Sequence, residues 1–387
     1  MIISQLSPSQ YGYFIIGLTI LQIIPQIFDL GLSETIVRFG SEGSRNKNFL
    51  KFVIFHVLKV RIITIIGLIL ASFLLVPTIS YFIKITNINI AITLELGIIG
   101  GAGTLLWNLI LSYYQLREKF STYGLLVIIN SIILGAIVVT FLTIKPLDYR
   151  WILFAYVVTP WMAIILFGYP LYHLLVSIKD DKYDRSLLKN KIRHFSIWLT
   201  SSTISWILCR RIEVFIISFF LPIQLVGVYG AAVQLYSPLQ MLARSVSVVI
   251  LPKIFKIRDV SIKKYLSYSF LFSIIAIGGI GILLALSAKF IVSFLSSEYI
   301  DSVGVFQILI FVPAAGSLAN LTSYIFLREN KPEIPSVINI IQAIFVTSAL
   351  LIVVPNYGIV GAAWCVLLTS ILGAVVQFLY AKKFLVN

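Results

Sequence analysis

The sequence predicts an all-α protein that crosses a membrane many times. Of its 387 residues, 59% are hydrophobic and only 12% are charged, whereas about a quarter of the residues in a soluble domain are charged. Mean hydropathy is +1.01. Apolar runs of about 20 residues, the length a helix needs to cross a bilayer, recur from end to end. Such a chain leaves no room for a soluble catalytic domain.

Eleven membrane-spanning helices are expected. Proline and glycine lie inside several of them, which membrane helices tolerate because neighbouring groups satisfy the freed backbone atoms. The expected spans are 11–33, 60–82, 90–114, 122–143, 151–177, 196–220, 225–250, 265–287, 303–327, 334–355 and 358–381.

The basic residues indicate how these helices are oriented. Alternate connecting segments hold 23 Lys and Arg on one side of the membrane and 4 on the other. Because basic residues concentrate in cytoplasmic loops, the first side is cytoplasmic and the C-terminus lies inside. This distribution also accounts for the net charge of +15, so the bilayer, and not a nucleic acid, is the expected partner.

Signatures of a catalytic or metal centre are missing from the sequence. Cys209 and Cys365 lie in apolar runs without metal-ligand spacing, and the three histidines are far apart. No metalloprotease, phosphate-loop or serine-hydrolase motif occurs. We therefore expect no enzymatic activity, no cofactor and no metal.

The chain contains an internal repeat. Leu6–Gly12 (LSPSQYG) resembles Leu221–Gly227 (LPIQLVG) at an offset of 215 residues, and Leu116–Glu118 resembles Leu327–Glu329 at an offset of 211. The second pair lies in loops that are both expected to be cytoplasmic. The two copies therefore face the same way, as do the parallel halves of some transporters.

The repeat divides the chain into two bundles and a hinge. Residues 1–177 would form a bundle of five helices, residues 196–387 a bundle of six, and residues 178–195 a charged cytoplasmic hinge. Helix 196–220 has no counterpart in the first half. We therefore expect that a first helix of roughly 25 residues is missing before residue 1; a protein with eleven helices is the alternative.

Several motifs resemble those of Wzx-type polysaccharide flippases, and their order and spacing cover nearly the whole chain. The family usually has Asp where this chain has Glu213. The matching segments are Leu6–Phe14 (LSPSQYGYF), Phe28–Leu32 (FDLGL), Val37–Phe39 (VRF), Arg211–Ile217 (RIEVFII), Gly227–Ala232 (GVYGAA) and Val354–Ala363 (VPNYGIVGAA).

The resemblance implies a two-lobed, MATE-like fold of the multidrug/oligosaccharidyl-lipid/polysaccharide (MOP) exporter superfamily. It also implies a function. The protein would flip an undecaprenyl-diphosphate-linked oligosaccharide across the bacterial inner membrane by alternating access, for O-antigen of lipopolysaccharide, capsule or exopolysaccharide. A polysaccharide polymerase and a chain-length regulator would be its partners. The alternatives are a small-molecule efflux antiporter of the same superfamily and a membrane polysaccharide polymerase or glycosyltransferase.

Helix 196–220 carries candidate substrate-binding residues. Ionisable groups are costly in hydrocarbon and are expected to face a polar path. Arg210 and Glu213 lie on one face of this helix, and Arg211 is turned by about 100°. Guanidinium groups bind diphosphate oxygens bidentately. Alternatively, Arg210 and Glu213 form an ion pair within the helix.

Helix 11–33 carries a second polar stripe. Gln22 and Gln26 are candidates for lining the sugar and diphosphate path, and Asp29 continues the stripe. The repeat offset places Asp29 opposite Arg244, which suggests that the two form a gating pair. Alternatively, Asp29 caps local structure and Arg244 extends to the cytoplasmic surface.

Two further charged residues, Arg38 and Glu95, are candidates. Arg38, near the cytoplasmic mouth, would receive the diphosphate or would only follow the positive-inside pattern. Glu213 and Glu95 are candidates for coupling to an ion, although Glu95 lies near the outer end of its span and the alternative is an interfacial position. The sequence does not identify the ion.

Overall fold

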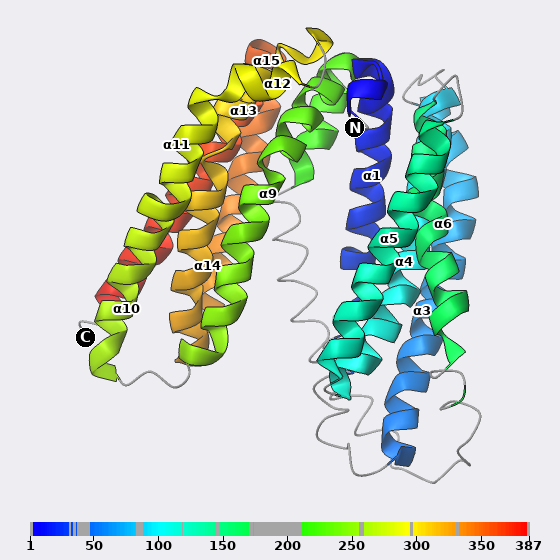
Figure 1. Ribbon diagram of the computed structural model, residues 1–387, viewed down its shortest axis with the longest axis horizontal. Coiled ribbons are helices and arrows are strands. Elements are labelled where there is room, and N and C mark those ends of the chain that lie inside the picture. The colour runs from blue at the N-terminus through cyan, green and yellow to red at the C-terminus, as the bar shows by residue number, and fades with distance from the viewer. Residues whose placement is uncertain are drawn as a thin grey trace. The chain divides into compact units, whose positions relative to one another are not determined.

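A computed structural model provides the structure of the chain. The described residues are 3–30, 32–33, 36, 47–82, 88–117, 119–143, 148–169, 173, 211–254, 259–294, 297–329, 331 and 333–384. For some helical residues among them, only the backbone is described. The regular secondary structure of the described residues is entirely helical (Figure 1).

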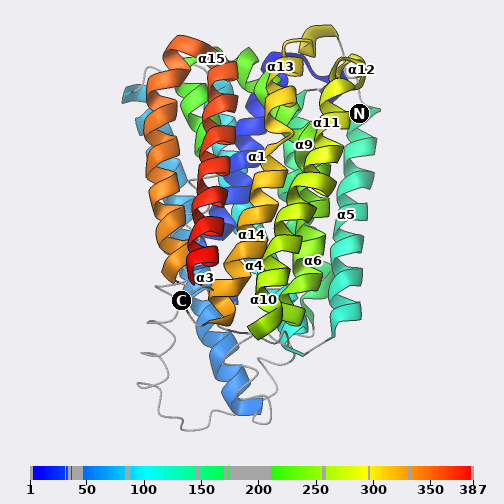
Figure 2. The same ribbon diagram turned by 90° about the vertical axis from the view of Figure 1, so that its left-hand side faces the viewer.

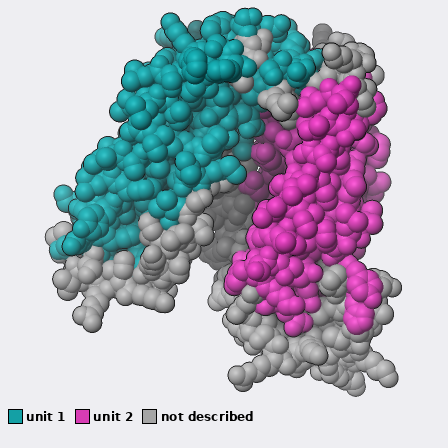
Figure 3. All heavy atoms as spheres, viewed as in Figure 1, with its two compact units in different colours: residues 1–12, 205–387 teal, residues 13–204 magenta. Residues whose placement is uncertain are grey.

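The chain forms two compact units (Figure 3). Unit 1 consists of Met1–Gly12 and Ser205–Asn387, and unit 2 consists of Tyr13–Ile204. The first twelve residues thus group with the C-terminal part, whereas the sequence assigned them to the N-terminal bundle. The predicted hinge at 178–195 lies outside the described residues, so that boundary stays a prediction.

Unit 2 contains most of α1 and four further long helices. Helix α4 packs against both α3 and α6, and α5 packs against α6 and α4. The bounds of the helices are α1 (Pro8–Phe28), α3 (Lys47–Phe82), α4 (Ile88–Leu116), α5 (Phe120–Leu142) and α6 (Tyr149–Phe167).

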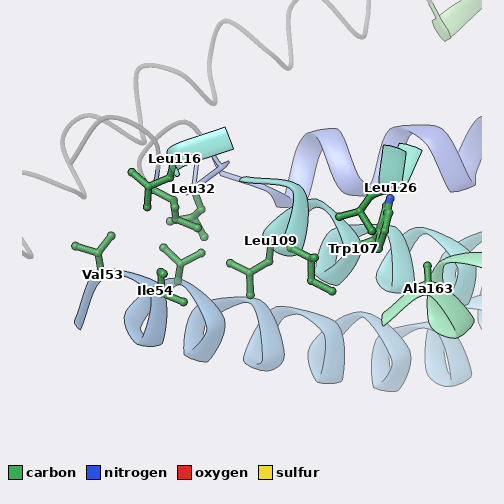
Figure 4. Packing of buried hydrophobic residues seen from close by; sticks show 11 residues of the cluster. Leu32, Val53, Ile54, Trp107, Leu109, Leu116, Leu126 and Ala163 are labelled. Atoms are coloured by element: carbon green, nitrogen blue, oxygen red, sulfur yellow. The ribbon is translucent and has the colours of Figure 1, made fainter. Parts of the chain in front are cut away.

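A cluster of buried apolar side chains joins these helices (Figure 4). Its members come from α3, α4, α5, α6 and the segment that follows α1. Burial of their apolar surface, together with close packing, holds the unit together. The side chains labelled in the figure are Leu32, Val53, Ile54, Trp107, Leu109, Leu116, Leu126 and Ala163.

Glycines of α4 let α1 approach closely. A Cβ atom at Gly101 would lie 2.6 Å from the Cβ of Ile24, and one at Gly97 would lie 2.9 Å from the carbonyl oxygen of Gly17. Small residues at such spacing allow close helix packing in membranes. They hold α1 beside α4 and so position the polar stripe of α1.

Unit 1 contains a helical segment at 211–220 and the C-terminal helices. Helix α14 packs against α9 and α15, and α13 packs against α9. Between α10 and α11 lies a π-helical stretch, η2, which packs against α14. The bounds are η1 (Ile3–Gln5), α9 (Ile223–Ile254), α10 (Asp259–Leu271), η2 (Phe272–Gly278), α11 (Gly279–Leu286), α12 (Ala288–Ser293), η3 (Ser297–Tyr299), α13 (Ser302–Leu309), α14 (Val312–Arg328) and α15 (Glu333–Phe384).

Element α15 consists of two helices joined at Gly358. This glycine has φ 61° and ψ −149°, a conformation that side chains disfavour. Figure 2 shows the two arms in orange and red, running beside each other. The Gln342 side chain of the first arm donates a hydrogen bond to the carbonyl oxygen of Thr369 in the second, at 2.8 Å. The two arms correspond to the expected spans 334–355 and 358–381.

Eight helices among the described residues are long and apolar enough to cross a membrane, with both arms of α15 counted as one. The predicted number of eleven is not tested, because the start of the expected span 196–220 lies outside the described residues. The structure differs from the expectation at α3. This helix begins at Lys47, well before the expected start at residue 60, so Arg61 lies well inside the helix and not at its start.

The N-terminal segment is anchored to the rest of unit 1. The Tyr299 hydroxyl donates a hydrogen bond to the carbonyl oxygen of Leu6 at 2.9 Å. Its ring meets the Tyr11 ring edge to face, with 6.0 Å between centroids. Burial raises the pKa of Tyr299 above its ordinary value, so the hydroxyl stays protonated and remains a donor.

Replacing Tyr299 with phenylalanine should destabilise this anchor. The substitution removes the hydroxyl and leaves the Leu6 carbonyl without that partner, a loss of about 1–3 kcal/mol. Thermal unfolding in detergent measures the change. Tyr357→Phe is the matched control, because Tyr357 is 72% exposed. Equal unfolding temperatures for the two variants would contradict the proposed anchoring role.

Candidate functional site

Asp29 organises the point at which α1 ends. Leu30 has φ 53°, in the left-handed region, and ends the helix. The Asp29 carboxylate then accepts two hydrogen bonds from Ser33, from its backbone N–H at 3.0 Å and from its hydroxyl at 2.8 Å. Asp29 therefore caps the turn that follows, which is the local role considered from the sequence.

Arg61 of α3 meets Asp29 inside unit 2. The arginine side chain is fully buried, and its Nη2 atom forms an ion pair with the Asp29 carboxylate. The same Nη2 donates to the Ser33 hydroxyl at 2.7 Å, and Nη1 donates to the carbonyl oxygen of Leu105 in α4 at 2.8 Å. One side chain thus links α3, α4 and the end of α1.

Sequence reasoning missed Arg61. The expected span 60–82 placed Arg61 at the very start of a helix, and the charge of Arg61 was counted with the preceding loop. The available signal was Asp29 itself, since a carboxylate in a membrane span requires a partner. The expected partner, Arg244, lies in α9, and its side chain is outside the described ones. The Asp29–Arg244 pair therefore stays a prediction, and the structure shows that Asp29 already has a cationic partner within unit 2.

The two glutamines of the stripe lie on α1. Both are partly buried, and the Gln26 amide donates to the carbonyl oxygen of Gln22 at 2.9 Å. The two side chains thus place polar atoms on one face of α1. Arg38 lies outside the described residues, so no contact of its side chain is known.

Glu213 lies in the helical segment 211–220. It is only 4% exposed. The Tyr229 hydroxyl of α9 lies close enough to the Glu213 carboxylate for the two to interact electrostatically, and it has no hydrogen-bond partner among the described residues. Arg211, in the same segment, is partly exposed, and Arg210 lies outside the described residues.

Glu95 of α4 is partly exposed, in contrast to Glu213. Cys365 of α15 is a buried free thiol. Within the described ranges, no three His, Cys, Asp or Glu side chains lie close enough together to hold a metal ion. Among the described residues, Asp29 with Arg61 and Glu213 with Tyr229 are thus two buried polar groups that each include one candidate residue, one group in each unit.

Comparison with known families identifies the chain. Residues 4–258 match the family described as "Polysaccharide biosynthesis protein". The chain belongs to this family. The match confirms the resemblance to polysaccharide flippases at the level of the family. Comparison with curated proteins finds no match.

Solved structures show the fold of this polysaccharide biosynthesis protein. It is similar to a multidrug resistance MATE family transporter of the MOP superfamily in an inward-facing conformation, with 13% identity and a TM-score of 0.77 over 99% of this chain and 92% of that one. It is also similar to the lipid II flippase MurJ, with 18% identity and a TM-score of 0.75 over 98% and 82%. The MATE transporter VcmN of Vibrio cholerae gives 14% identity and a TM-score of 0.59 over 97% and 86%.

These likenesses establish a MATE-like fold. The polysaccharide biosynthesis protein is thus a multi-pass membrane protein. Its substrate and pathway are matters for the proposal that follows.

Proposed function

We propose that the protein flips an undecaprenyl-diphosphate-linked oligosaccharide from the cytoplasmic to the outer leaflet of the bacterial inner membrane. The observation that carries the proposal is the family match over residues 4–258, on a chain whose fold is similar to that of the lipid II flippase MurJ. The product would supply O-antigen, capsule or exopolysaccharide assembly. A polymerase and a chain-length regulator would act on it afterwards.

The basic candidates would bind the diphosphate. Arg210, Arg211 and Arg38 carry guanidinium groups, which match phosphate oxygens and keep their charge in a low dielectric. Gln22 and Gln26 offer amide donors and acceptors to sugar hydroxyls. The polyprenyl tail would remain in the lipid, so only the polar head requires such partners. The Asp29–Arg244 pair, if formed, would serve as the gating pair that the repeat suggests.

Depletion of the protein in its host is the test of this function. The expected result is loss of surface polysaccharide, with lipid-linked oligosaccharide accumulating where externally added glycosidase cannot reach it. Complementation with the wild-type chain should restore both. Unchanged surface polysaccharide in the depleted strain would reject the proposal.

Efflux of small molecules is the second candidate, because the fold is also that of MATE multidrug transporters. The same depletion strain separates the two functions. If the protein is an efflux antiporter, its depletion should leave surface polysaccharide unchanged and increase drug sensitivity. If it is a flippase, its depletion should reduce surface polysaccharide and leave drug sensitivity unchanged.

Glu213 would couple transport to an ion. A buried carboxylate binds a proton or a small cation with an affinity that depends strongly on its surroundings. Glu213 is more enclosed than Glu95, and the Tyr229 hydroxyl lies near it. Both properties favour Glu213 as the coupling residue over Glu95.

Glu213→Gln should abolish the dependence of transport on an ion gradient. The amide keeps the shape of the side chain but carries no charge. Flipping in liposomes, measured with and without a proton or sodium gradient, should show acceleration for the wild type and equal rates for the variant. Glu298→Gln is the control, because Glu298 is exposed and lies outside the spans. Acceleration of the Glu213→Gln variant to the wild-type extent would contradict the assignment.

A further inference from the structure

The break between α1 and the following turn is held by a side chain from another helix. Leu30 adopts a left-handed conformation that a leucine rarely takes. Such a conformation persists only where the surroundings impose it. Here Arg61 provides that constraint, because it donates hydrogen bonds to the Asp29 carboxylate and to the Ser33 hydroxyl.

The geometry requires arginine in particular. Its two terminal nitrogens reach different partners, with Nη1 on the Leu105 carbonyl oxygen and Nη2 on Asp29 and Ser33. Lysine carries its three donors on one nitrogen, so it lacks the two separated nitrogens, fixed in one plane, with which arginine reaches these partners. The site lies next to the apolar cluster of Ile65, Ala102 and Leu105, where a low dielectric strengthens each bond.

Stability alone does not explain this buried pair. Well-packed apolar residues of similar volume often replace a buried ion pair without loss of stability. Apolar contacts are non-directional, so apolar residues in these places could not fix the orientation of the turn after α1. The clamp, meaning Arg61 with Asp29, Ser33 and Leu105, fixes both the rotation of the end of α1 and the angle at which the chain leaves it.

The clamp also determines the orientation of the polar stripe of α1. Gln22 and Gln26 lie seven and three residues before Asp29, on the same face of the helix. A helix anchored at Asp29 cannot rotate, so the two glutamines keep their direction. We propose that Arg61 is a positioning residue for transport, acting through Asp29 on this stripe. The inference rests on the proposed function, because it assigns the stripe to the substrate path.

A double variant without charges tests whether Arg61 acts by positioning α1 or only by neutralising Asp29. Asp29→Asn with Arg61→Gln leaves no unpaired charge, so the protein should fold, but the shorter glutamine side chain cannot reach all three partners of the arginine. Flipping in liposomes should fall by about tenfold or more, because a small misplacement near the substrate has large effects. Wild-type rates in this double variant would overturn the proposal.

Two single variants keep the test decisive if the double variant does not fold. Arg61→Lys keeps the charge and should accumulate normally, yet it should flip about tenfold more slowly; wild-type rates here would also overturn the proposal. Thr159→Val is the control. Thr159 is buried in the same unit, but among the described residues its hydroxyl bonds only to the Ala155 carbonyl oxygen of its own helix, so flipping should be unchanged.

A labelling experiment reads the position directly. In a chain with Cys209→Ala and Cys365→Ala, a Gln26→Cys reporter is treated with maleimide. Arg61→Lys should change its labelling rate by about twofold or more, whereas Thr159→Val should not. An unchanged rate would overturn the inference. If the wild type flips no lipid-linked oligosaccharide, the proposed function fails, while this readout still decides whether Arg61 positions α1.

Discussion

Replacing Arg61 with methionine is expected to lower the free energy of unfolding by about 3–5 kcal/mol, the usual cost of removing one partner of a buried ion pair. The Asp29 side chain is only 14% exposed, so its carboxylate would be left with little solvation. The Leu105 carbonyl oxygen and the Ser33 hydroxyl would also lose a donor. Unfolding in detergent, followed by circular dichroism, measures the effect.

A second substitution, at Asp29, provides the control for this prediction. Adding Asp29→Asn to Arg61→Met removes the isolated charge, so the double variant should be more stable than Arg61→Met alone. Two costs that simply add would show that Asp29 and Arg61 do not interact in the folded protein.

Replacing Gly227 with alanine is expected to destabilise unit 1 by about 1–3 kcal/mol or more, as overpacking usually does. A Cβ atom at Gly227 would lie 2.0 Å from the carbonyl oxygen of Pro8, and one at Gly12 would lie 2.2 Å from the carbonyl oxygen of Ile223. Backbone atoms cannot move aside as a flexible side chain can. The starts of α1 and α9 would therefore have to separate.

The matched control carries the same substitution at an open position. Gly304 lies in α13 of the same unit, and a Cβ atom there would meet nothing within 4 Å. Because alanine favours helix over glycine by about 1 kcal/mol, Gly304→Ala should stabilise slightly while Gly227→Ala destabilises. Unfolding temperatures that move in the same direction would contradict the close approach of α1 and α9.

This contact gives the internal repeat a structural meaning. Gly12 and Gly227 are equivalent positions of the repeat, and in the structure they lie against each other's helices. The equivalence was visible in the sequence, because similar segments recur at a nearly constant offset. The contact was not visible, since two equivalent segments can lie far apart in a folded chain.

The candidate site shows the same division. That Asp29 needed a partner followed from its place in an apolar span. That the partner is Arg61 did not follow, because α3 begins before its apolar part, and the pattern therefore placed Arg61 at the end of a span and not within a helix. The repeat pointed instead to Arg244, a residue whose equivalence to Asp29 in sequence carries no information about the packing of α3 against α4.

The sequence by itself determined the membrane environment, the helical class, the repeat and the family, because each depends on local apolarity or on residue order along the chain. The tertiary structure alone decided which charged groups meet and where the first twelve residues belong. Those outcomes depend on the close packing of helices distant in sequence. The clamp of Arg61, Asp29, Ser33 and Leu105 forms because the end of α1 and the middle parts of α3 and α4 lie next to one another in the folded chain.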